Sequence, residues 1–364
     1  MRRLRLGLVT LHACLLVALG AVTMRSERSH AELTPAVASV QPAEDTGGTE
    51  VVASIRSVGA SAAPRARPVA AMSVAAPSGR PVTVEEVRAS WSPPVWFPEG
   101  ARDALWKLTA LDGAPVGVAH APKVRARAAI VADLDRGEVL WARRADEAFP
   151  VASLTKVVSA LALASADPDL DSELCVTYEQ WPPRPGARSR FSTGGCHEGW
   201  EYVGAALVAS DNRGAMAMAS LSGLPFEVFI ERMGEVSADL GMTAARWADP
   251  TGLEDEDMAS ARDMARAIVA LSEHPLLVPA GDAPWWEIDV GERRRALGTT
   301  NRLAGDGGFD ILAAKTGYTD TAGYCFTAVV RTRSGRTLAL TVLGAPTNAA
   351  RFADARALIR AAEG

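Results

Sequence analysis

A serine and a lysine three residues apart could perform nucleophilic chemistry at the start of a predicted helix. Ser153 and Lys156 lie in the stretch Pro150–Lys156, and apolar residues continue at helical spacing as far as Ala162. Because positions i and i+3 share a helix face, the two side chains can approach each other. A serine hydroxyl becomes a good nucleophile when a base takes its proton, and lysine is a base only where its pKa is lowered. The pair predicts acyl transfer through a serine ester, although alone it also fits an ordinary surface serine and lysine.

Two further short motifs could complete such a site. Ser210-Asp211-Asn212 interrupts two helical patterns, so a tight connection would present its side chains. Lys315-Thr316-Gly317 precedes a strand predicted over 322–330, where the glycine allows a substrate backbone to approach and the other two residues can hold an anionic group. Each motif alone fits an ordinary turn. Together the three supply a nucleophile, a base, a proton relay and a cationic group, which is the set that acyl transfer requires.

The motifs must be positioned by two predicted hairpins and by the helices between them. One hairpin precedes the Ser153 motif and the other follows the Lys315 motif. Strands are predicted over 128–134 and 138–142, joined at Asp135-Arg136-Gly137, and over 324–331 and 337–344, joined at Ser334-Gly335. Helices are predicted from Ser153, over 202–208 and 215–221, between Pro225 and Gly241, from Ser260 to Pro275, and around Phe352–Ile359. This order predicts an α+β fold in which helices flank an antiparallel sheet.

The N-terminal third has the composition of targeting and spacer segments. In residues 1–31, Arg2, Arg3 and Arg5 precede an apolar run from Leu6 to about Met24, and a small-residue cleavage site follows. The segment is therefore expected to be a signal peptide or, if uncut, an N-terminal membrane anchor. Residues 32–84 are rich in Ala and Pro and are expected to form a disordered linker. Residues 85–123 are Trp-rich, and docking on the domain is preferred to facing a membrane. The body of the protein is expected to be exported, to the periplasm or elsewhere in the cell envelope.

Charge and cysteine content add two expectations. A net charge of −5 gives no indication of nucleic-acid binding. Cys175 and Cys196 flank a polar, loop-rich segment over 171–199, and in an oxidising compartment they could pair; paired and free states both stay open. Cys325 lies in an apolar strand pattern and is expected to be a buried thiol.

The three motifs together are the signature of penicillin-recognising serine enzymes. Longer stretches, above all Lys315–Cys325, resemble the low-molecular-weight D-alanyl-D-alanine carboxypeptidases and the related endopeptidases. The resemblance runs from about Val124 to the C-terminus, so residues 124–364 are expected to be a penicillin-binding serine peptidase domain. It implies a β-lactamase/transpeptidase-like fold with an all-helical subdomain, and it leaves residues 1–123 uncovered.

The resemblance also implies a role for each motif residue. Ser153 would be acylated by the penultimate D-alanine of a peptidoglycan stem peptide, with Lys156 as general base. Ser210 would pass the proton to the leaving amine, and Asn212 would bind the substrate amide.

On the strand side, Lys315 and Thr316 would hold the terminal carboxylate, and Gly317 would leave room for the substrate. The backbone N–H groups of Ser153 and Tyr318 would form the oxyanion hole. The resemblance requires no metal or cofactor, and it implies that β-lactams act as covalent inhibitors.

Three other functions were weighed against a carboxypeptidase. A D-alanyl-D-alanine endopeptidase, which would cleave peptidoglycan cross-links, remains the first alternative. A class A β-lactamase is disfavoured because no asparagine of the chain has a glutamate four residues before it. A non-catalytic module that binds peptidoglycan or β-lactams is the alternative of another class. The carboxypeptidase is preferred.

Overall fold

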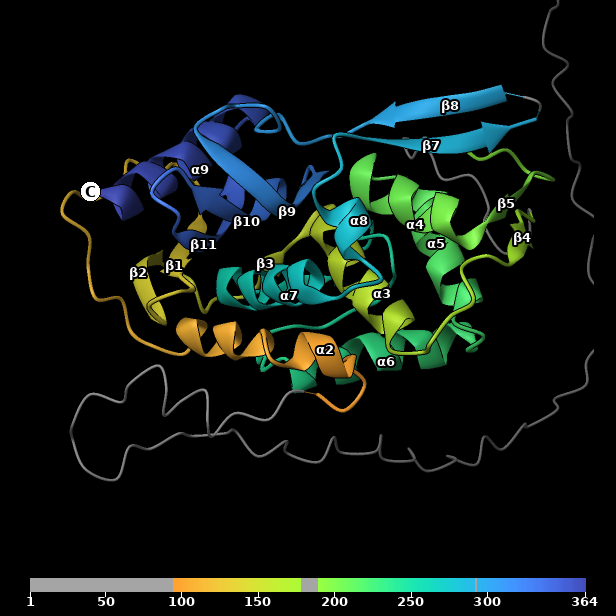
Figure 1. Ribbon diagram of the computed structural model, residues 1–364, viewed down its shortest axis with the longest axis horizontal. Helices are drawn as coiled ribbons and strands as arrows, with labels where there is room; N and C mark the ends of the chain where they lie inside the picture. Colours follow the sequence, from red (N-terminus) through yellow and green to blue (C-terminus); the bar gives the residue numbers. More distant parts are fainter. Residues whose placement is uncertain (1–93, 178–188, 292) are drawn as a thin grey trace, which may run out of the picture. The chain divides into compact units, whose positions relative to one another are not determined.

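The computed structural model describes residues 94–177, 189–291 and 293–364 (Figure 1). These residues all belong to one compact unit of the chain, Arg67–Gly364. The leader expected over 1–31, the linker over 32–84 and the first part of the Trp-rich segment lie outside the described residues. Within the described part, no helix combines the length and hydropathy needed to span a bilayer.

The helical elements lie mostly in the middle of the chain. They are α2 (Glu99–Arg102), η1 (Leu105–Leu111), η2 (Ala152–Leu154), α3 (Thr155–Ala164), α4 (Gly199–Val208), α5 (Asn212–Leu221), α6 (Phe226–Asp239), α7 (Ala261–Glu273), α8 (Val278–Gly281) and α9 (Asn348–Glu363), where η denotes a 3-10 helix. Helices α3 to α7 and α9 confirm the six helical segments that the sequence predicts. Helix α7 begins as predicted at Ser260, whose hydroxyl accepts a hydrogen bond from Asp263 N.

The strands form one main sheet and three small ones. They are β1 (Ala128–Asp133), β2 (Glu138–Arg143), β3 (Phe149–Pro150), β4 (Glu173–Cys175), β5 (Cys196–Glu198), β6 (Met258–Ala259), β7 (Trp285–Val290), β8 (Arg293–Gly298), β9 (Phe309–Thr319), β10 (Gly323–Thr332) and β11 (Thr337–Ala345). The main sheet has the order β2-β1-β11-β10-β9 and its neighbouring strands are antiparallel. Both predicted hairpins are present. Lys315–Gly317 precedes the strand predicted over 322–330, which is β10, but the motif also lies within a strand of its own, β9, which was not predicted.

Helices cover both faces of the main sheet, as the α+β prediction requires (Figure 1). Successive residues of a strand point to opposite faces. Val131 of β1 therefore joins the cluster that contains Phe352 of α9, and Ile130 joins the cluster that contains Ile268 of α7. The all-helical subdomain is built around α3. This helix is buried along its whole length, and α4, α5, α6 and α7 pack around it.

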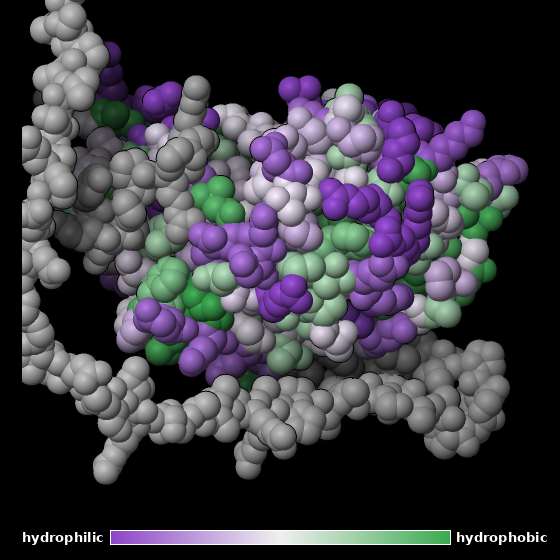
Figure 2. Space-filling model, turned by 180° about the vertical axis from the view of Figure 1, so that it is seen from behind, coloured by the Kyte–Doolittle hydropathy of each residue, from purple (hydrophilic) through white to green (hydrophobic). Residues whose placement is uncertain are grey.

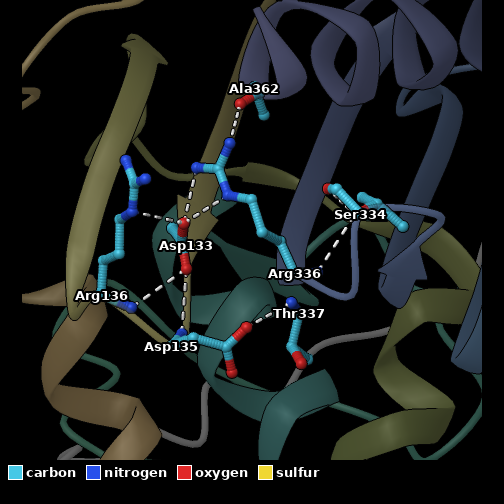
Figure 3. A network of polar contacts seen from close by, with 8 residues as sticks. Asp133, Asp135, Arg136, Ser334, Arg336, Thr337 and Ala362 are labelled. Carbon is cyan, nitrogen blue, oxygen red and sulfur yellow. Dashed lines mark hydrogen bonds and ion pairs between the residues drawn. The ribbon is translucent and has the colours of Figure 1, made fainter.

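A polar network fixes the end of the sheet that lies away from Lys315–Gly317 (Figure 3). Asp133, at the end of β1, is fully buried and accepts hydrogen bonds from the Asp135 and Arg136 backbone N–H groups. Its other oxygen accepts a 2.8 Å bond from Arg336 Nε, and Arg336 also donates to the Ala362 carbonyl of α9. A buried carboxylate is tolerated here because an arginine and two N–H groups satisfy it. The network ties the β1–β2 turn, the β10–β11 turn and α9 together.

The described part of the Trp-rich segment packs on the helical layer. Phe97 and Leu105 are buried in the same cluster as the residues of α3 and α7. The Lys107 ammonium forms a 2.5 Å ion pair with Glu273 at the end of α7, and Asp112 pairs with Arg266. On the face of the molecule seen in Figure 2, hydrophilic residues alternate with small hydrophobic patches among the described residues.

Candidate active site

Ser153 lies in a tight turn that leads directly into the buried helix α3. The turn is the 3-10 segment Ala152–Leu154, and Ala152 has a φ of 50°, a left-handed conformation that is uncommon for a residue with a side chain. The turn places Ser153 just before the N-terminus of α3, where its side chain is only half-buried. Lys156 follows in the first turn of α3 and is completely buried.

Lys156 Nζ has three polar neighbours within hydrogen-bond distance. It lies 2.7 Å from Ser153 Oγ, 2.8 Å from Asn212 Oδ1 and 2.6 Å from the Thr251 carbonyl. The last two are oxygen atoms that only accept hydrogen bonds, so they take the two N–H groups of a neutral amine. The nitrogen lone pair then faces Ser153 Oγ and can accept the hydroxyl proton. This arrangement is that of a general base and its nucleophile.

The electrostatics of Lys156 favour this neutral form. Burial lowers the pKa of Lys156 to about 8, against the opposing attraction of Asp249, Asp211 and Asp257. With that pKa, roughly one in ten of these amines is neutral at pH 7. The base is therefore available near neutral pH, which an ordinary lysine would not be.

The Ser210–Asn212 motif forms the short connection between α4 and α5, as predicted. Ser210 has a φ of 59°, and this left-handed residue turns the chain so sharply that Asn212 is already the first residue of α5. The fully buried Asp211 caps α5 by accepting a hydrogen bond from Gly214 N. The loop thus presents Ser210 and Asn212 on the side of Lys156, while the side chain between them anchors it.

Strand β9 brings Lys315 to the same place from the sheet. The Lys315 ammonium donates a 2.9 Å hydrogen bond to Ser210 Oγ and a 3.0 Å bond to the Thr316 carbonyl. Burial, followed by the positive charges of Lys156 and Arg351, lowers the pKa of Lys315 well below its ordinary value. A bound carboxylate would counter both effects, since an opposite charge stabilises the ammonium form. The Thr316 hydroxyl lies 2.6 Å from the Thr300 hydroxyl.

Gly317 allows the edge strand to lie directly against the Ser153 turn. A Cβ atom at this glycine would be 2.8 Å from the Val151 carbonyl oxygen, which is closer than Cβ atoms are found, and 3.1 Å from Ser153 N, which is a tight contact. Strand β9 is the outermost strand of the sheet, so one row of its backbone groups is free of strand partners. Tyr318 follows in the strand, and its half-exposed ring stacks on Tyr324.

Two parts of the site were not found by sequence reasoning. The first is the turn Asp249–Gly252, whose Thr251 carbonyl accepts a hydrogen bond from Lys156. The second is Arg351 of α9, which donates to the carbonyls of Gly317 (2.8 Å) and Cys325 (3.1 Å) and so supports β9 from behind. Burial lowers the pKa of Arg351 to about 10. Residue types alone do not reveal either part. The contact of Thr251 is made by its backbone oxygen, and Arg351 lies in a helix whose pattern is typical of an exposed surface.

The segment over 171–199 is tied to the site through Asp211. Cys175 and Cys196 form a disulfide bond between β4 and β5, and Cys325 is a buried free thiol. Within the loop that this disulfide closes, the Ser189 hydroxyl and the Arg190 N–H both donate 2.7 Å hydrogen bonds to Asp211. Across the described ranges, histidine, cysteine and carboxylate side chains do not gather in groups of three or more that could hold a metal ion.

The three motifs meet in two sets of hydrogen bonds that share the loop between α4 and α5. One set runs from Ser153 through Lys156 to Asn212, while in the other Lys315 bonds Ser210 in the same loop. Elements from the sheet, the helical layer and the loop between α4 and α5 meet here.

Comparison with known proteins gives a family for this chain. Residues 116–347 match the model of the D-alanyl-D-alanine carboxypeptidase family of peptidases. A D-alanyl-D-alanine endopeptidase of Pseudomonas aeruginosa is 31% identical over 71% of this chain and 84% of its own length. The D-alanyl-D-alanine carboxypeptidase DacF of Bacillus subtilis is 29% identical over 61% of this chain and 58% of its own length.

A solved structure shares the fold as well. Penicillin-binding protein D2 of Listeria monocytogenes, in its ampicillin-bound form, superposes with a TM-score of 0.58 and 28% identity over 66% of this chain and 99% of that one. The match agrees with the predicted transpeptidase-like architecture. Since the family model covers well over half of the sequence, this chain belongs to the D-alanyl-D-alanine carboxypeptidase family of serine peptidases.

Proposed function

We propose that this protein hydrolyses the terminal D-alanyl-D-alanine bond of peptidoglycan stem peptides through an acyl-enzyme on Ser153. The observation that carries the proposal is the contact set of the buried Lys156. Its Nζ faces the Ser153 hydroxyl at 2.7 Å, while two obligate acceptors take its N–H groups. In its neutral form, a lysine held in this way can remove the proton of the neighbouring alcohol.

The first step of the reaction would form the ester. Ser153 Oγ attacks the carbonyl of the penultimate D-alanine as its proton moves to Lys156 Nζ. The backbone N–H groups of Ser153 and Tyr318 would stabilise the tetrahedral oxyanion, an effect typically of about 3 kcal/mol per hydrogen-bond donor.

The leaving D-alanine must then receive a proton and release its carboxylate. Ser210 would relay a proton to the leaving amine. Its hydroxyl accepts a hydrogen bond from Lys315, and it lies in the same loop as Asn212, which accepts a hydrogen bond from Lys156. Lys315 and Thr316 would bind the terminal carboxylate, and Asn212 would bind the substrate amide. Water then hydrolyses the ester and returns Ser153 to its free form.

Cleavage of D-alanyl cross-links is the second candidate, and one observation favours it. The Pseudomonas relative, of which this chain covers 84%, is named an endopeptidase, whereas the chain covers 58% of the Bacillus carboxypeptidase. The two activities share the acylation step and differ in the leaving group, which is free D-alanine in one case and a second stem peptide in the other.

Two experiments test the proposal in sequence. A fluorescent penicillin should label the wild-type protein covalently and leave Ser153→Ala unlabelled; reversible binding that survives the substitution would instead indicate a non-catalytic module. Purified muropeptides then decide between the activities. Free D-alanine from uncross-linked pentapeptides identifies the carboxypeptidase, and monomers released from cross-linked dimers identify the endopeptidase.

We further propose that the protein acts outside the cytoplasm, either released from its leader or attached through it. The N-terminal basic and apolar sequence supports export, and a disulfide bond is typical of oxidising compartments. Cell fractionation with N-terminal sequencing of the mature protein tests this: a cytoplasmic protein that begins at Met1 would contradict it.

A further inference from the structure

Two buried carboxyl groups act electrostatically on the general base, Lys156. Asp249 and Asp257 are 4% and 0% exposed, although both are acidic. They lie on a loop between α6 and α7, and Lys156 lies on α3. Buried acidic side chains are uncommon, because burial disfavours their charged form. The pair therefore calls for a role.

Asp249 organises the turn that presents the Thr251 carbonyl to Lys156. Its Oδ1 accepts hydrogen bonds from Thr251 N at 2.5 Å, Thr251 Oγ1 at 2.9 Å and Gly252 N at 2.7 Å. A carboxylate that caps two successive N–H groups fixes the peptide units of the turn. The carbonyl of Thr251 consequently points at Lys156 Nζ, 2.6 Å away.

The turn also packs tightly against the backbone segment that carries the nucleophile, Ser153. Gly252 has a φ of 79°, and a Cβ atom there would lie 2.0 Å from the Ala152 carbonyl oxygen. Ser159 of α3 donates a 2.8 Å hydrogen bond to the Pro250 carbonyl. Any displacement of the turn would therefore move both the base and the Ser153 turn.

We propose that Asp249 is a positioning residue for the general base, which holds the Thr251 carbonyl against Lys156 and contributes a negative charge behind the amine. This role rests on the proposed acylation of Ser153. It acts through Lys156 and does not require Asp249 to touch the substrate.

Asp257 supports this arrangement as a neutral acid. Its Oδ1 accepts hydrogen bonds from Ala248 N and Asp249 N, but its fully buried Oδ2 has no hydrogen-bond partner, so a charge there would be unsatisfied. Burial and then the charge of Asp249 raise the pKa of Asp257 to about 8. Asp249 differs from Asp257, because both of its oxygens accept hydrogen bonds from donors of the turn.

The charge of Asp249 has a measurable consequence for Lys156. The groups that act on the Lys156 amine are Asp249 and Asp257 from the turn, Asp211 from the α4–α5 loop and Lys315 from β9. Removing one negative charge from this set lowers the pKa of the amine, because an anion stabilises the ammonium form. More of the base is then neutral at low pH.

The test measures the rate of acylation by a fluorescent penicillin at pH 6 and pH 8. For a base with a pKa of about 8 the rate ratio between these pH values is about 50, and it falls to about 10 if the pKa drops by one unit. Because the ratio is taken within one preparation, a lower yield of folded protein does not change it. A purely structural role for Asp249 would therefore leave the ratio unaltered.

Three variants separate charge from geometry. Asp249→Asn keeps an acceptor oxygen for the turn and removes the charge, so the ratio should fall towards 10. Asp249→Glu keeps the charge but misplaces the acceptor, so the rate should fall at least tenfold at both pH values while the ratio stays near 50. Asp257→Asn replaces an acid that is neutral at pH 6 by a neutral amide, so the acylation rate at pH 6 should stay close to that of the wild-type protein.

The control is Asp133→Asn, at the other end of the main sheet, which also removes a buried carboxylate but should leave the ratio near 50. A ratio near 50 in Asp249→Asn, with the wild-type rate, would overturn the role of Asp249 while the peptidase function stands. Wild-type protein that is not acylated, or Ser153→Ala that is, would overturn the peptidase function and this role together.

Discussion

Lys315 of the sheet and Ser210 of the helical layer are joined by a 2.9 Å hydrogen bond from Nζ to Oγ. The two residues are 105 positions apart in the sequence. Ser210 reaches Lys315 because its φ of 59° turns the backbone out of α4. A buried ammonium that donates to a hydroxyl leaves that hydroxyl free to donate in turn, so Ser210 can pass a proton towards the leaving amine.

Replacing Ser210 by alanine should slow acylation about 100-fold, which is within the usual contribution of one proton-transfer group. The change leaves Lys315 buried without its side-chain acceptor, and the thermal midpoint should fall by a few degrees. Stopped-flow acylation by a chromogenic cephalosporin measures the first effect. Ser272→Ala is the matched control, because it removes a serine hydroxyl that bonds the Val269 carbonyl within α7 and touches neither lysine. Equal rates in the wild-type protein and Ser210→Ala would exclude the relay.

The pH dependence of acylation should report Lys156. Its pKa of about 8 means that the rate rises about tenfold per pH unit from pH 5.5 to 7.5 and levels off above pH 8.5, as the ammonium loses its proton. The measurement is the second-order rate constant with a penicillin that is itself stable over this range. Asn212→Asp adds a negative charge beside the amine, which should move the rise to higher pH. A rate that does not vary between pH 6 and 9 would contradict the role of Lys156.

Gly252→Ala should slow acylation, because it disturbs the backbone of the turn that contacts Ala152. The φ of 79° at Gly252 disfavours alanine, and the new methyl group would collide with the Ala152 carbonyl. We expect acylation to fall at least about 100-fold and the free energy of unfolding to drop by about 2 kcal/mol or more. Gly234→Ala is the control, since nothing lies within 4 Å of a Cβ atom on this exposed helical glycine. Urea denaturation and the acylation rate check both variants, and wild-type behaviour of Gly252→Ala would refute the close packing.

The disulfide bond should stabilise the protein and support the Ser210 loop. Cys175 and Cys196 close a loop of 21 residues, for which the expected loss on removal is about 3 kcal/mol. Because Ser189 and Arg190 bond Asp211, reduction should also slow acylation. A thermal melt with and without dithiothreitol measures the effect. The double variant Cys175→Ser, Cys196→Ser should melt at the lower temperature in both conditions; a reductant effect that persists in it would point to another cause.

Local signals in the sequence were strong enough to place most elements. The hairpin of β1 and β2 follows from two apolar runs around Asp135-Arg136-Gly137, and α7 follows from the Ser260 cap and the apolar period behind it. Such signals depend on neighbouring residues alone, so tertiary contacts do not alter them. The elements over 276–314 were not predicted: β7 and β8 form an exposed hairpin, and β9 carries buried polar residues where a strand pattern would be apolar.

The sequence by itself determined which chemical groups the protein holds: a serine and lysine on one helical turn, a second serine with an amide, and a lysine beside a glycine. Their spacing and order follow from the residues alone. Only the tertiary structure decided that both lysines are buried, that the Thr251 carbonyl faces Lys156, and that the Gly317 strand lies against Ser153. The pKa of an amine depends on the solvent and charges around it in space, and these come from segments far apart in the sequence. For that reason the base could be named from the sequence, but its strength required the fold.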